Sequence, residues 1–202
     1  MDSEVLFGTD LPEGKLYIKK NGLSYRLTNI EVEKVPHDHD HGHSHGLRES
    51  SFSKVDLEFK GSYNPRIIPP EKHQEKYNFY LGSDRSKWAE GCSAFSELLF
   101  KDIYKGIDLR MYSNEGAIKY DWLVSENANA SEITLKYSDD TEIFLEDGCA
   151  FIGLKSASMM ENRPISYQTD KNGNKVMIET AEHQCNSSIG ITLRHHCSDG
   201  RG

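Results

Sequence analysis

Histidine is the most conspicuous source of chemistry in this sequence. Five of its nine histidines stand at alternate positions in the segment HDHDHGHSHG, residues 37–46: His37, His39, His41, His43 and His45. Imidazole binds zinc, copper and nickel well, and alternate side chains of an extended chain point the same way. Weak binding of Zn²⁺ or Ni²⁺ is therefore expected in solution.

A specific metal site needs more than imidazole rings. Metal-bound histidines are held by a second layer of hydrogen bonds that fixes each ring. The neighbours in this run, such as Gly42 and Ser44, supply no such support. We therefore interpret residues 35–53 as a flexible, histidine-rich loop with adventitious metal binding and no true cofactor. The alternative is a surface protein that buffers metal or is switched by it.

Two aspartates form a second candidate site. The segments IDLRM and IKYDWLV alternate apolar and polar residues, as half-buried strands do, and 113–116 between them is predicted to turn. This register places Asp108 opposite Asp121 and Arg110 opposite Lys119 on one face. Facing carboxylates suit Ca²⁺ binding or acid–base chemistry. The simpler interpretation is that the two basic neighbours neutralise the face without any ligand.

The third candidate is aromatic. The segment YNFYLGSDRSKWAEG brings Tyr77, Phe79, Tyr80 and Trp88 close together in the chain. Exposed rings with polar handles suit a sugar or a peptide, and Tyr80 and Trp88 are the predicted ligand contacts. In the competing interpretation, Phe79 and Trp88 belong to the core, and alternation leaves only Tyr80 outside.

Residues suited to catalysis follow no recognised pattern. The G-x-S-x-G match at 42–46 lies inside the polar histidine run and not on a strand-to-helix turn, and the sequence has no H-E-x-x-H or phosphate-binding loop, so we predict that it is not an enzyme. None of the four cysteines lies in a C-x-x-C pair, which argues against a zinc knuckle. We expect free thiols at Cys92 and Cys149. Arg163, before Pro164, is expected to tie a strand to an acidic loop such as 139–147.

Strands are expected to position these side chains. Asn-Gly pairs at 21–22 and 172–173 mark hairpins, and a single helical turn capped by Ser83 is expected in 83–91. Many short strands with turns between them predict an all-β fold, an antiparallel β-sandwich. The strand-like segments are 15–20, 23–27, 55–59, 107–111, 118–124, 133–137, 141–145, 165–169 and 175–180.

Length and charge bound the organisation and the partners. The 202 residues suffice for one domain, and we expect a single β-sandwich over 1–180 with a last strand or tail over 181–202. The net charge of −8 disfavours nucleic acid and anionic membrane surfaces as partners. No apolar run is long enough to cross a bilayer, and the first residues lack the features of a signal peptide.

Four phrases follow one another in the middle of the chain: YNFYLGSDRSKW, YKGIDLRMYSNEGAIKYDWLV, NASEITLKY and ENRPISYQ. Together they resemble the β-rich N-terminal domain of large secreted bacterial surface proteins, over roughly residues 15–180. Those proteins carry SBBP-type propeller repeats and PKD or other immunoglobulin-like modules. In the Bacteroidetes they often end in a type IX secretion or gliding-motility-associated domain.

The resemblance implies a secreted or cell-surface location and a non-catalytic accessory role in adhesion, gliding-associated assembly or protein–protein contact. Its partners would be other domains of the same larger chain, or protein or glycan at the cell surface. The family offers no established catalytic residues to transfer. Two alternatives stay open: a carbohydrate-binding module that uses the aromatic segment, and a metal-binding surface protein that uses the histidine run.

Overall fold

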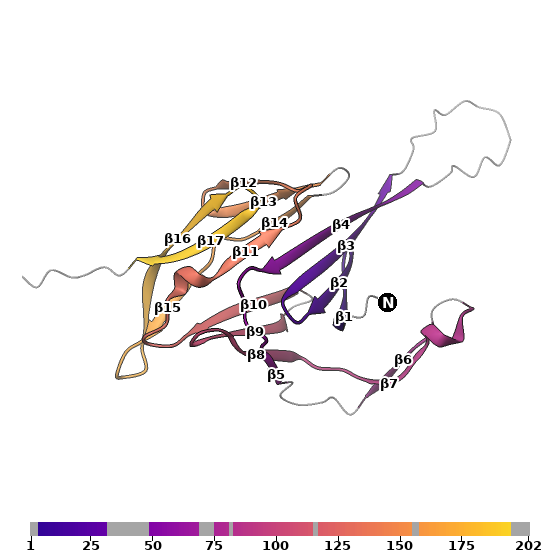
Figure 1. The fold of residues 1–202 in the computed structure, drawn as a ribbon, viewed down its shortest axis with the longest axis horizontal. Helices are drawn as coiled ribbons and strands as arrows, with labels where there is room; N and C mark the ends of the chain where they lie inside the picture. The colour runs from indigo at the N-terminus through magenta and orange to yellow at the C-terminus, as the bar shows by residue number, and fades with distance from the viewer. Residues whose placement is uncertain are drawn as a thin grey trace, which may run out of the picture.

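The computed structural model describes residues 4–31, 49–68, 75–80, 83–114, 117–154 and 158–194. Within these ranges the regular structure is strand, apart from two single turns of 3-10 helix, and all strand pairs are antiparallel (Figure 1). The predicted all-β fold is therefore confirmed. No helix in the described ranges has the length and apolar character that a membrane crossing requires.

The largest sheet has eight strands in the order β1-β2-β3-β4-β11-β17-β16-β15. Its strands are β1 (Val5–Leu11), β2 (Gly14–Lys19), β3 (Gly22–Glu31), β4 (Glu49–Phe59), β11 (Thr134–Tyr137), β15 (Ser166–Thr169), β16 (Lys175–Cys185) and β17 (Ser188–Arg194). Strands β1 to β4 form a meander, because each pairs with the next along the chain. Strand β17 lies inside the sheet between β11 and β16, and its Ile189 and Ile191 are buried in the core.

A second sheet of four strands covers one face of the first. It has the order β10-β9-β8-β5, with β5 (Arg66–Ile68), β8 (Glu97–Tyr104), β9 (Ile107–Asn114) and β10 (Ala117–Val124). Phe59 of β4 packs edge-on against Trp122 of β10, with ring centroids 5.7 Å apart. The Tyr104 hydroxyl donates to the backbone oxygens of Lys60 at 3.3 Å and Thr134 at 3.4 Å. These contacts between the layers make the fold a β-sandwich.

Two smaller sheets complete the described chain. A three-stranded sheet consists of β12 (Glu142–Glu146), β13 (Cys149–Gly153) and β14 (Ser158–Glu161). A two-stranded sheet pairs β6 (Lys76–Phe79) with β7 (Ala89–Ser93), joined through the 3-10 turn η1 (Arg85–Lys87). We call β6, η1 and β7 together the aromatic arm, and Figure 1 shows it extending away from the sandwich. The second 3-10 turn, η2 (Ala130–Glu132), precedes β11.

The two predicted hairpins with Asn-Gly pairs are present. Lys19 pairs with Gly22, so the β2–β3 turn consists of Lys20 and Asn21, one position earlier than the predicted pair. In the β15–β16 turn, Gly173 has a φ of 85°, in the left-handed region that favours glycine. Asp170 closes that turn by accepting hydrogen bonds from two backbone N–H groups that follow it.

The register predicted for β9 and β10 is wrong by two residues. Asp121 pairs with Arg110, and Asp108 pairs with Leu123, so the two aspartates do not face each other. Pairing continues toward the turn as far as Ala117 and Asn114. Residues 113 and 114 therefore belong to the ladder, although they were predicted to be part of the turn. A strand pattern repeats every two residues, so a shift of two leaves every side chain on its predicted face.

Two further expectations need correction. The helical turn is capped by Asp84 rather than Ser83, because the Asp84 carboxylate accepts a hydrogen bond from the Ser86 backbone N–H at 3.1 Å. Residues 49–53, expected in the flexible loop, belong to β4, whose pairing with β3 reaches Glu49 and Glu31. The histidine run, His37 to His45, falls in 32–48 and lies outside the described residues.

Candidate functional site

The most unusual polar feature of the interior is a carboxyl group shared by three sheets. Glu161, the last residue of β14, accepts a hydrogen bond from the Tyr120 hydroxyl at 2.6 Å and from the Tyr137 hydroxyl at 2.7 Å. Tyr120 comes from β10 in the four-stranded sheet, and Tyr137 ends β11 in the eight-stranded sheet. Each carboxyl oxygen therefore connects the three-stranded sheet to a different layer of the sandwich.

Strand alternation explains why these side chains point inward. Tyr137 follows the buried Leu135 by two positions in β11, and Tyr120 precedes Trp122 by two positions in β10. Residues two apart in a strand share a face, so both tyrosines project into the space between the sheets. Glu161 pairs with the buried Ala150 at the end of the β13–β14 ladder, where the chain leaves the small sheet.

The electrostatics of this site are dominated by burial. Burial raises the pKa of Glu161 above its usual value, although the two tyrosine hydroxyls that donate to it act in the opposite direction. Burial and the nearby Glu161 charge raise the pKa values of Tyr120 and Tyr137, so both phenols stay protonated at physiological pH. The tyrosines therefore act as hydrogen-bond donors to the Glu161 carboxyl.

Two further groups lie within the field of Glu161. Burial, followed by the Glu161 charge, raises the pKa of Glu182 in β16 to about 7. The Glu182 Oε2 atom is buried and has no hydrogen-bond partner among the described residues. Burial and then the Glu161 charge also raise the pKa of Tyr25 in β3. We call Tyr25, Tyr120, Tyr137, Glu161 and Glu182 the buried acid cluster.

Within the buried acid cluster, the pKa of Glu182, raised to about 7, lies near neutral pH. General acid–base catalysis would require a carboxyl within hydrogen-bond reach of a substrate. Glu161 is instead half-buried, and both of its carboxyl oxygens are already bonded to tyrosine hydroxyls. The arrangement therefore joins three sheets through one carboxyl group.

Sequence reasoning did not find the buried acid cluster. Its five members come from β3, β10, β11, β14 and β16, so no local spacing connects them. The one available signal was Glu161 itself, which directly follows Met159 and Met160. An acid that ends an apolar strand is too common to identify a site on its own.

The aromatic arm holds the predicted contacts Tyr80 and Trp88 side by side. Their rings pack edge-on with centroids 5.0 Å apart, and the Arg85 guanidinium lies over Trp88 at 5.4 Å from the ring centroid. Tyr77, Phe79 and Tyr80 are 46%, 47% and 53% exposed. The interpretation of Phe79 as a core residue is therefore wrong, because the arm stands outside the sandwich.

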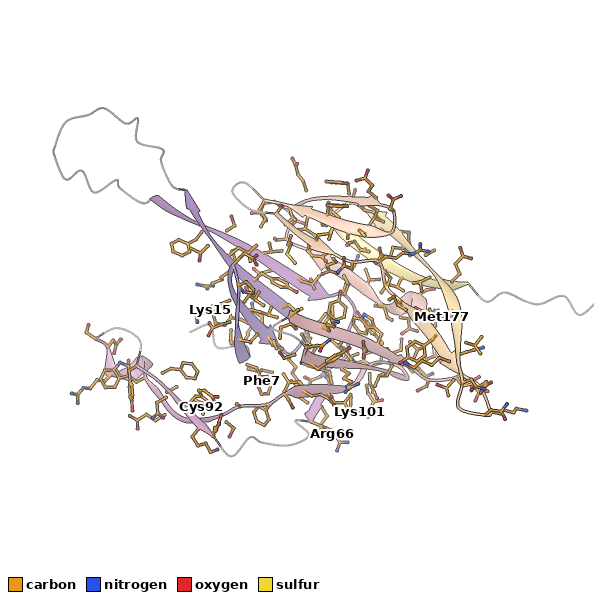
Figure 2. All side chains as sticks on the ribbon, turned by 180° about the vertical axis from the view of Figure 1, so that it is seen from behind. Phe7, Lys15, Arg66, Cys92, Lys101 and Met177 are labelled. Atoms are coloured by element: carbon orange, nitrogen blue, oxygen red, sulfur yellow. The ribbon has the colours of Figure 1, made fainter. Side chains whose placement is uncertain are left out.

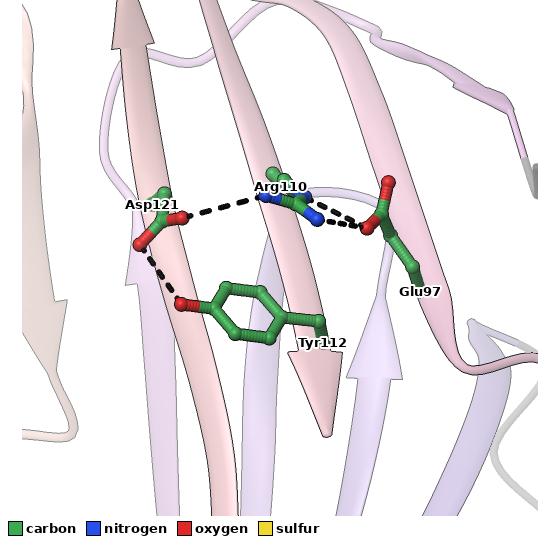
Figure 3. Close-up of polar contacts among 4 residues, drawn as sticks. All are labelled: Glu97, Arg110, Tyr112 and Asp121. Atoms are coloured by element: carbon green, nitrogen blue, oxygen red, sulfur yellow. Dashed lines mark hydrogen bonds and ion pairs between the residues drawn. The ribbon is translucent and has the colours of Figure 1, made fainter. Parts of the chain in front are cut away.

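The predicted aspartate pair is replaced by two separate ionic groups on the outer face of the second sheet. Asp108 binds the Lys101 ammonium and accepts a hydrogen bond from the Asp102 backbone N–H at 2.8 Å. Asp121 lies 3.9 Å from the Arg110 guanidinium, as Figure 3 shows. The structure thus agrees with neutralisation by basic neighbours, but Arg110 and Lys101 supply the charge rather than Lys119.

Arg110 is the centre of a small network. Its Nε atom donates to Glu97 Oε2 at 2.7 Å across the β8–β9 ladder, and the Tyr112 hydroxyl donates to Asp121 at 3.4 Å (Figure 3). The guanidinium also lies 4.9 Å from the centroid of the Tyr112 ring. We call Glu97, Arg110, Tyr112 and Asp121 the surface network.

A cleft of about 640 Å³ opens beside the β2–β3 turn and the end of β11. Its charged side chains pair with one another: Lys19 lies 3.9 Å from Asp56, and Lys136 lies 3.8 Å from Asp139. Asp56 also binds Lys54 at 2.6 Å. Because its acids and bases compensate each other, this cleft has little net charge with which to attract an ion.

Cys92, Cys149 and Cys185 are free thiols, as expected for the first two. Among the described residues, no three His, Cys, Asp or Glu side chains are grouped to hold a metal ion. The stem of Arg163 lies against Gly148 in the β12–β13 turn, where an added Cβ would meet it at 2.9 Å.

Comparison with known proteins places the chain in a family. No curated protein and no solved structure matches it. One family profile, described as a domain of unknown function, matches residues 1–196. Since the match covers nearly the whole sequence, the chain belongs to the DUF7948 domain family, whose function is unknown.

Proposed function

We propose that this chain is a non-catalytic interaction domain of a secreted or cell-surface protein, and that the aromatic arm binds a protein partner. The location is supported by the ordered phrases that resemble N-terminal domains of secreted bacterial surface proteins. The binding role is supported by one observation: the arm exposes Tyr77, Phe79 and Tyr80 on a two-stranded sheet that projects from the sandwich (Figure 1).

An exposed arm of this kind is poorly stabilised by itself. A two-stranded hairpin is marginally stable in water, and clustered apolar surface usually marks a contact site. Tyr77 and Phe79 alternate with Lys76 and Asn78 along β6, so their rings share one face, while Tyr80 packs against Trp88 beyond the strand. The exposed rings therefore lie along β6 and just beyond its end, where a partner can contact them together.

The chemistry of the arm favours a protein with an apolar pocket and a basic rim. Tyrosine, tryptophan and arginine are the residues that most often dominate binding energy at protein interfaces. The Tyr77 hydroxyl donates to Glu75 at 3.1 Å, and the Tyr80 hydroxyl is hydrogen-bonded to Glu90. These bonds orient the rings in advance and place two carboxylates at their polar edges.

Site-specific photo-crosslinking in the native cells tests this proposal. A photo-reactive phenylalanine replaces Tyr80 in the intact protein, or Met177 in a control. Met177 is 65% exposed and lies at the opposite end of the molecule from Cys92 of the arm (Figure 2). We expect position 80, and not 177, to crosslink to one defined protein segment that combines apolar with Lys or Arg residues.

Purified components then give the quantitative test. Phe79→Ser is expected to weaken binding of the crosslinked partner by at least about tenfold, as for an interface hot spot, while Met177→Ser leaves binding unchanged. Unchanged melting temperatures would show that both variants remain folded. Equal crosslinking at both positions, or equal binding by both variants, would contradict the proposal.

A carbohydrate ligand is the second candidate, and the perpendicular pair of Tyr80 and Trp88 favours it. Their rings meet at an interplanar angle of 77°, which forms a corner that a sugar ring can enter. A glycan array probed with the wild-type chain and with Tyr80→Ala decides between the candidates. Glycan binding that is lost in Tyr80→Ala, with no protein crosslink at position 80, would replace the protein partner by a glycan.

A further inference from the structure

Strand β10 forms an open edge of the four-stranded sheet. On one side it pairs with β9 over eight consecutive residue pairs, from Ala117 to Val124, without a register shift. On the other side it pairs with no described strand. Alternate backbone N–H and C=O groups of β10 therefore have no sheet partner among the described residues. Such a row of unpaired groups is a template for the addition of another strand.

The other edge strands of the described sheets are less suited to strand addition. Pairing of β1 is interrupted by a register shift between Val5 and Phe7. Strands β5, β12, β14 and β15 have only three to five residues each. Proteins commonly protect sheet edges with short strands and irregular pairing. With eight residues, β10 is the longest regularly paired edge in the described part of the chain.

The inward side chains of β10 are incompletely covered. In β9, which has a strand on each side, Leu109 and Met111 are fully buried. Ile118 and Trp122 of β10 also pack against the core, yet both are only half-buried. Because both strands belong to the same sheet and face the same core, the difference lies at the open side of β10. An added strand would complete the cover of these two apolar side chains.

The charged side chains of β10 indicate which strand would fit. Lys119 and Asp121 are its two charged residues, and both lie on the outer face. Lys119 is exposed, and no described residue forms an ion pair or hydrogen bond with it. The contacts of Asp121 both come from β9: the Arg110 guanidinium at 3.9 Å and the Tyr112 hydroxyl at 3.4 Å (Figure 3). A complementary strand would bring an acid to Lys119 and a base to Asp121.

A second copy of β10 meets this requirement in one antiparallel register. Residues directly opposite each other share a face, so their numbers must both be odd or both be even. With Tyr120 opposite Tyr120 of the second copy, Lys119 of each copy lies opposite Asp121 of the other. A register centred on Lys119 or on Asp121 would instead bring like charges directly opposite each other, which is destabilising.

The apolar residues of β10 agree with the same register. With Tyr120 at the centre, Ile118 lies opposite Trp122 of the second copy, and the exposed Ala117 lies opposite the exposed Leu123. We propose that two copies of this chain associate through their β10 edges in this register, with a twofold axis at Tyr120. The two four-stranded sheets then form one continuous sheet across the interface. This pairing is independent of the aromatic arm and of its partner.

Sedimentation velocity on the full chain tests this interface. One strand from each copy buries a small area, so association should be weak and reversible, and protein concentrations from about 1 to about 300 µM are compared. We expect the average mass of the wild type to rise with concentration from that of the 23.0 kDa monomer toward twice that mass. Lys119→Asp and Asp121→Lys each place like charges opposite each other, so each should weaken association at least about tenfold.

A matched control separates the interface from overall charge. Lys171→Asp changes the net charge by the same amount as Lys119→Asp, at an exposed position in the β15–β16 turn, and should associate like the wild type. Unchanged melting temperatures would show that the variants remain folded. Lys119 has no described contact to lose, so Lys119→Asp decides the question by itself if Asp121→Lys does not fold.

An equimolar mixture of the two variants tests the register. In a mixed pair, the two acids of the Lys119→Asp copy lie opposite the two lysines of the Asp121→Lys copy, so both charge pairs are restored. We expect the mixture to associate at least as tightly as the wild type, although each variant alone stays monomeric. A wild type that is monomeric at every concentration, variants that associate like the wild type, or a mixture that stays monomeric would each overturn the proposal.

Discussion

Tyr120 and Asp121 are neighbours in β10, yet they belong to two opposite kinds of polar structure. Tyr120 points into the sandwich and donates to Glu161 at 2.6 Å in the buried acid cluster. Asp121 points outward, 3.9 Å from Arg110, in the surface network of Figure 3. Each group contains two carboxylates and at least one tyrosine, but only the surface network contains a cation.

The difference shows how environment sets the value of similar hydrogen bonds. In the surface network, the Arg110 guanidinium neutralises Glu97 and Asp121, and water screens what remains. In the buried acid cluster no arginine or lysine is among the groups that act most strongly on Glu161 and Glu182, and burial raises the pKa of both. Loss of a partner should therefore be far more damaging inside than outside.

The largest loss of stability is expected when the Glu161 carboxylate is removed, and removal of the Asp121 carboxylate from the surface network is the matched control. Glu161→Ala leaves the Tyr120 and Tyr137 hydroxyls without their acceptor, and each unpaired buried donor costs about 1–3 kcal/mol. We expect the free energy of unfolding, measured by urea denaturation at pH 6, to fall by about 2–5 kcal/mol. Asp121→Ala should lower it by less than about 1 kcal/mol. Comparable losses in the two variants would show that the buried acid cluster has no special structural value.

The fold was largely accessible from the sequence, because strand alternation records which side chains face the core. Ile107, Leu109 and Met111 of β9 are all buried, as the alternation predicts. The same two-residue period explains the wrong register: pairing Asp121 with Asp108 or with Arg110 leaves the faces unchanged. The strands β6 and β14 were not predicted, although β11 and β15, which also have four residues, were.

The candidate sites were accessible only in part. Tyr80 and Trp88 could be paired from the sequence, because eight positions separate them and one short arm holds both. The exposure of Phe79 could not be predicted, because no residue pattern in its own segment indicates that β6 lies outside the sandwich. The surroundings of Glu161 depend on how strands as distant as β3 and β16 are arranged in the fold. Local sequence patterns do not indicate that arrangement.

A smaller effect is expected from tyrosine hydroxyls removed one at a time. Tyr120→Phe removes a donor from buried Glu161, and we expect a loss of about 1–2 kcal/mol in the free energy of unfolding. Tyr112→Phe removes a 3.4 Å hydrogen bond to Asp121 at the surface, for which we expect a loss below about 0.5 kcal/mol. The two substitutions delete the same atom from the same hairpin. Equal losses would remove the distinction between the inner and outer faces.

The smallest effect is expected from the ionic bond between Arg110 and Glu97. Arg110→Ala removes contacts from the guanidinium to Glu97, whose Oε2 atom lies 2.7 Å from Nε, and to Asp121. Exposed ion pairs contribute about 0.2–1 kcal/mol, and salt weakens them further. We therefore expect a loss of about 0.5–1 kcal/mol in low salt that shrinks in 1 M NaCl. The corresponding loss in Glu161→Ala should not change with salt, because mobile ions do not reach a buried carboxylate. If high salt instead restores the free energy of unfolding of Glu161→Ala and leaves that of Arg110→Ala unchanged, our view that salt screens the surface carboxylates and not Glu161 is wrong.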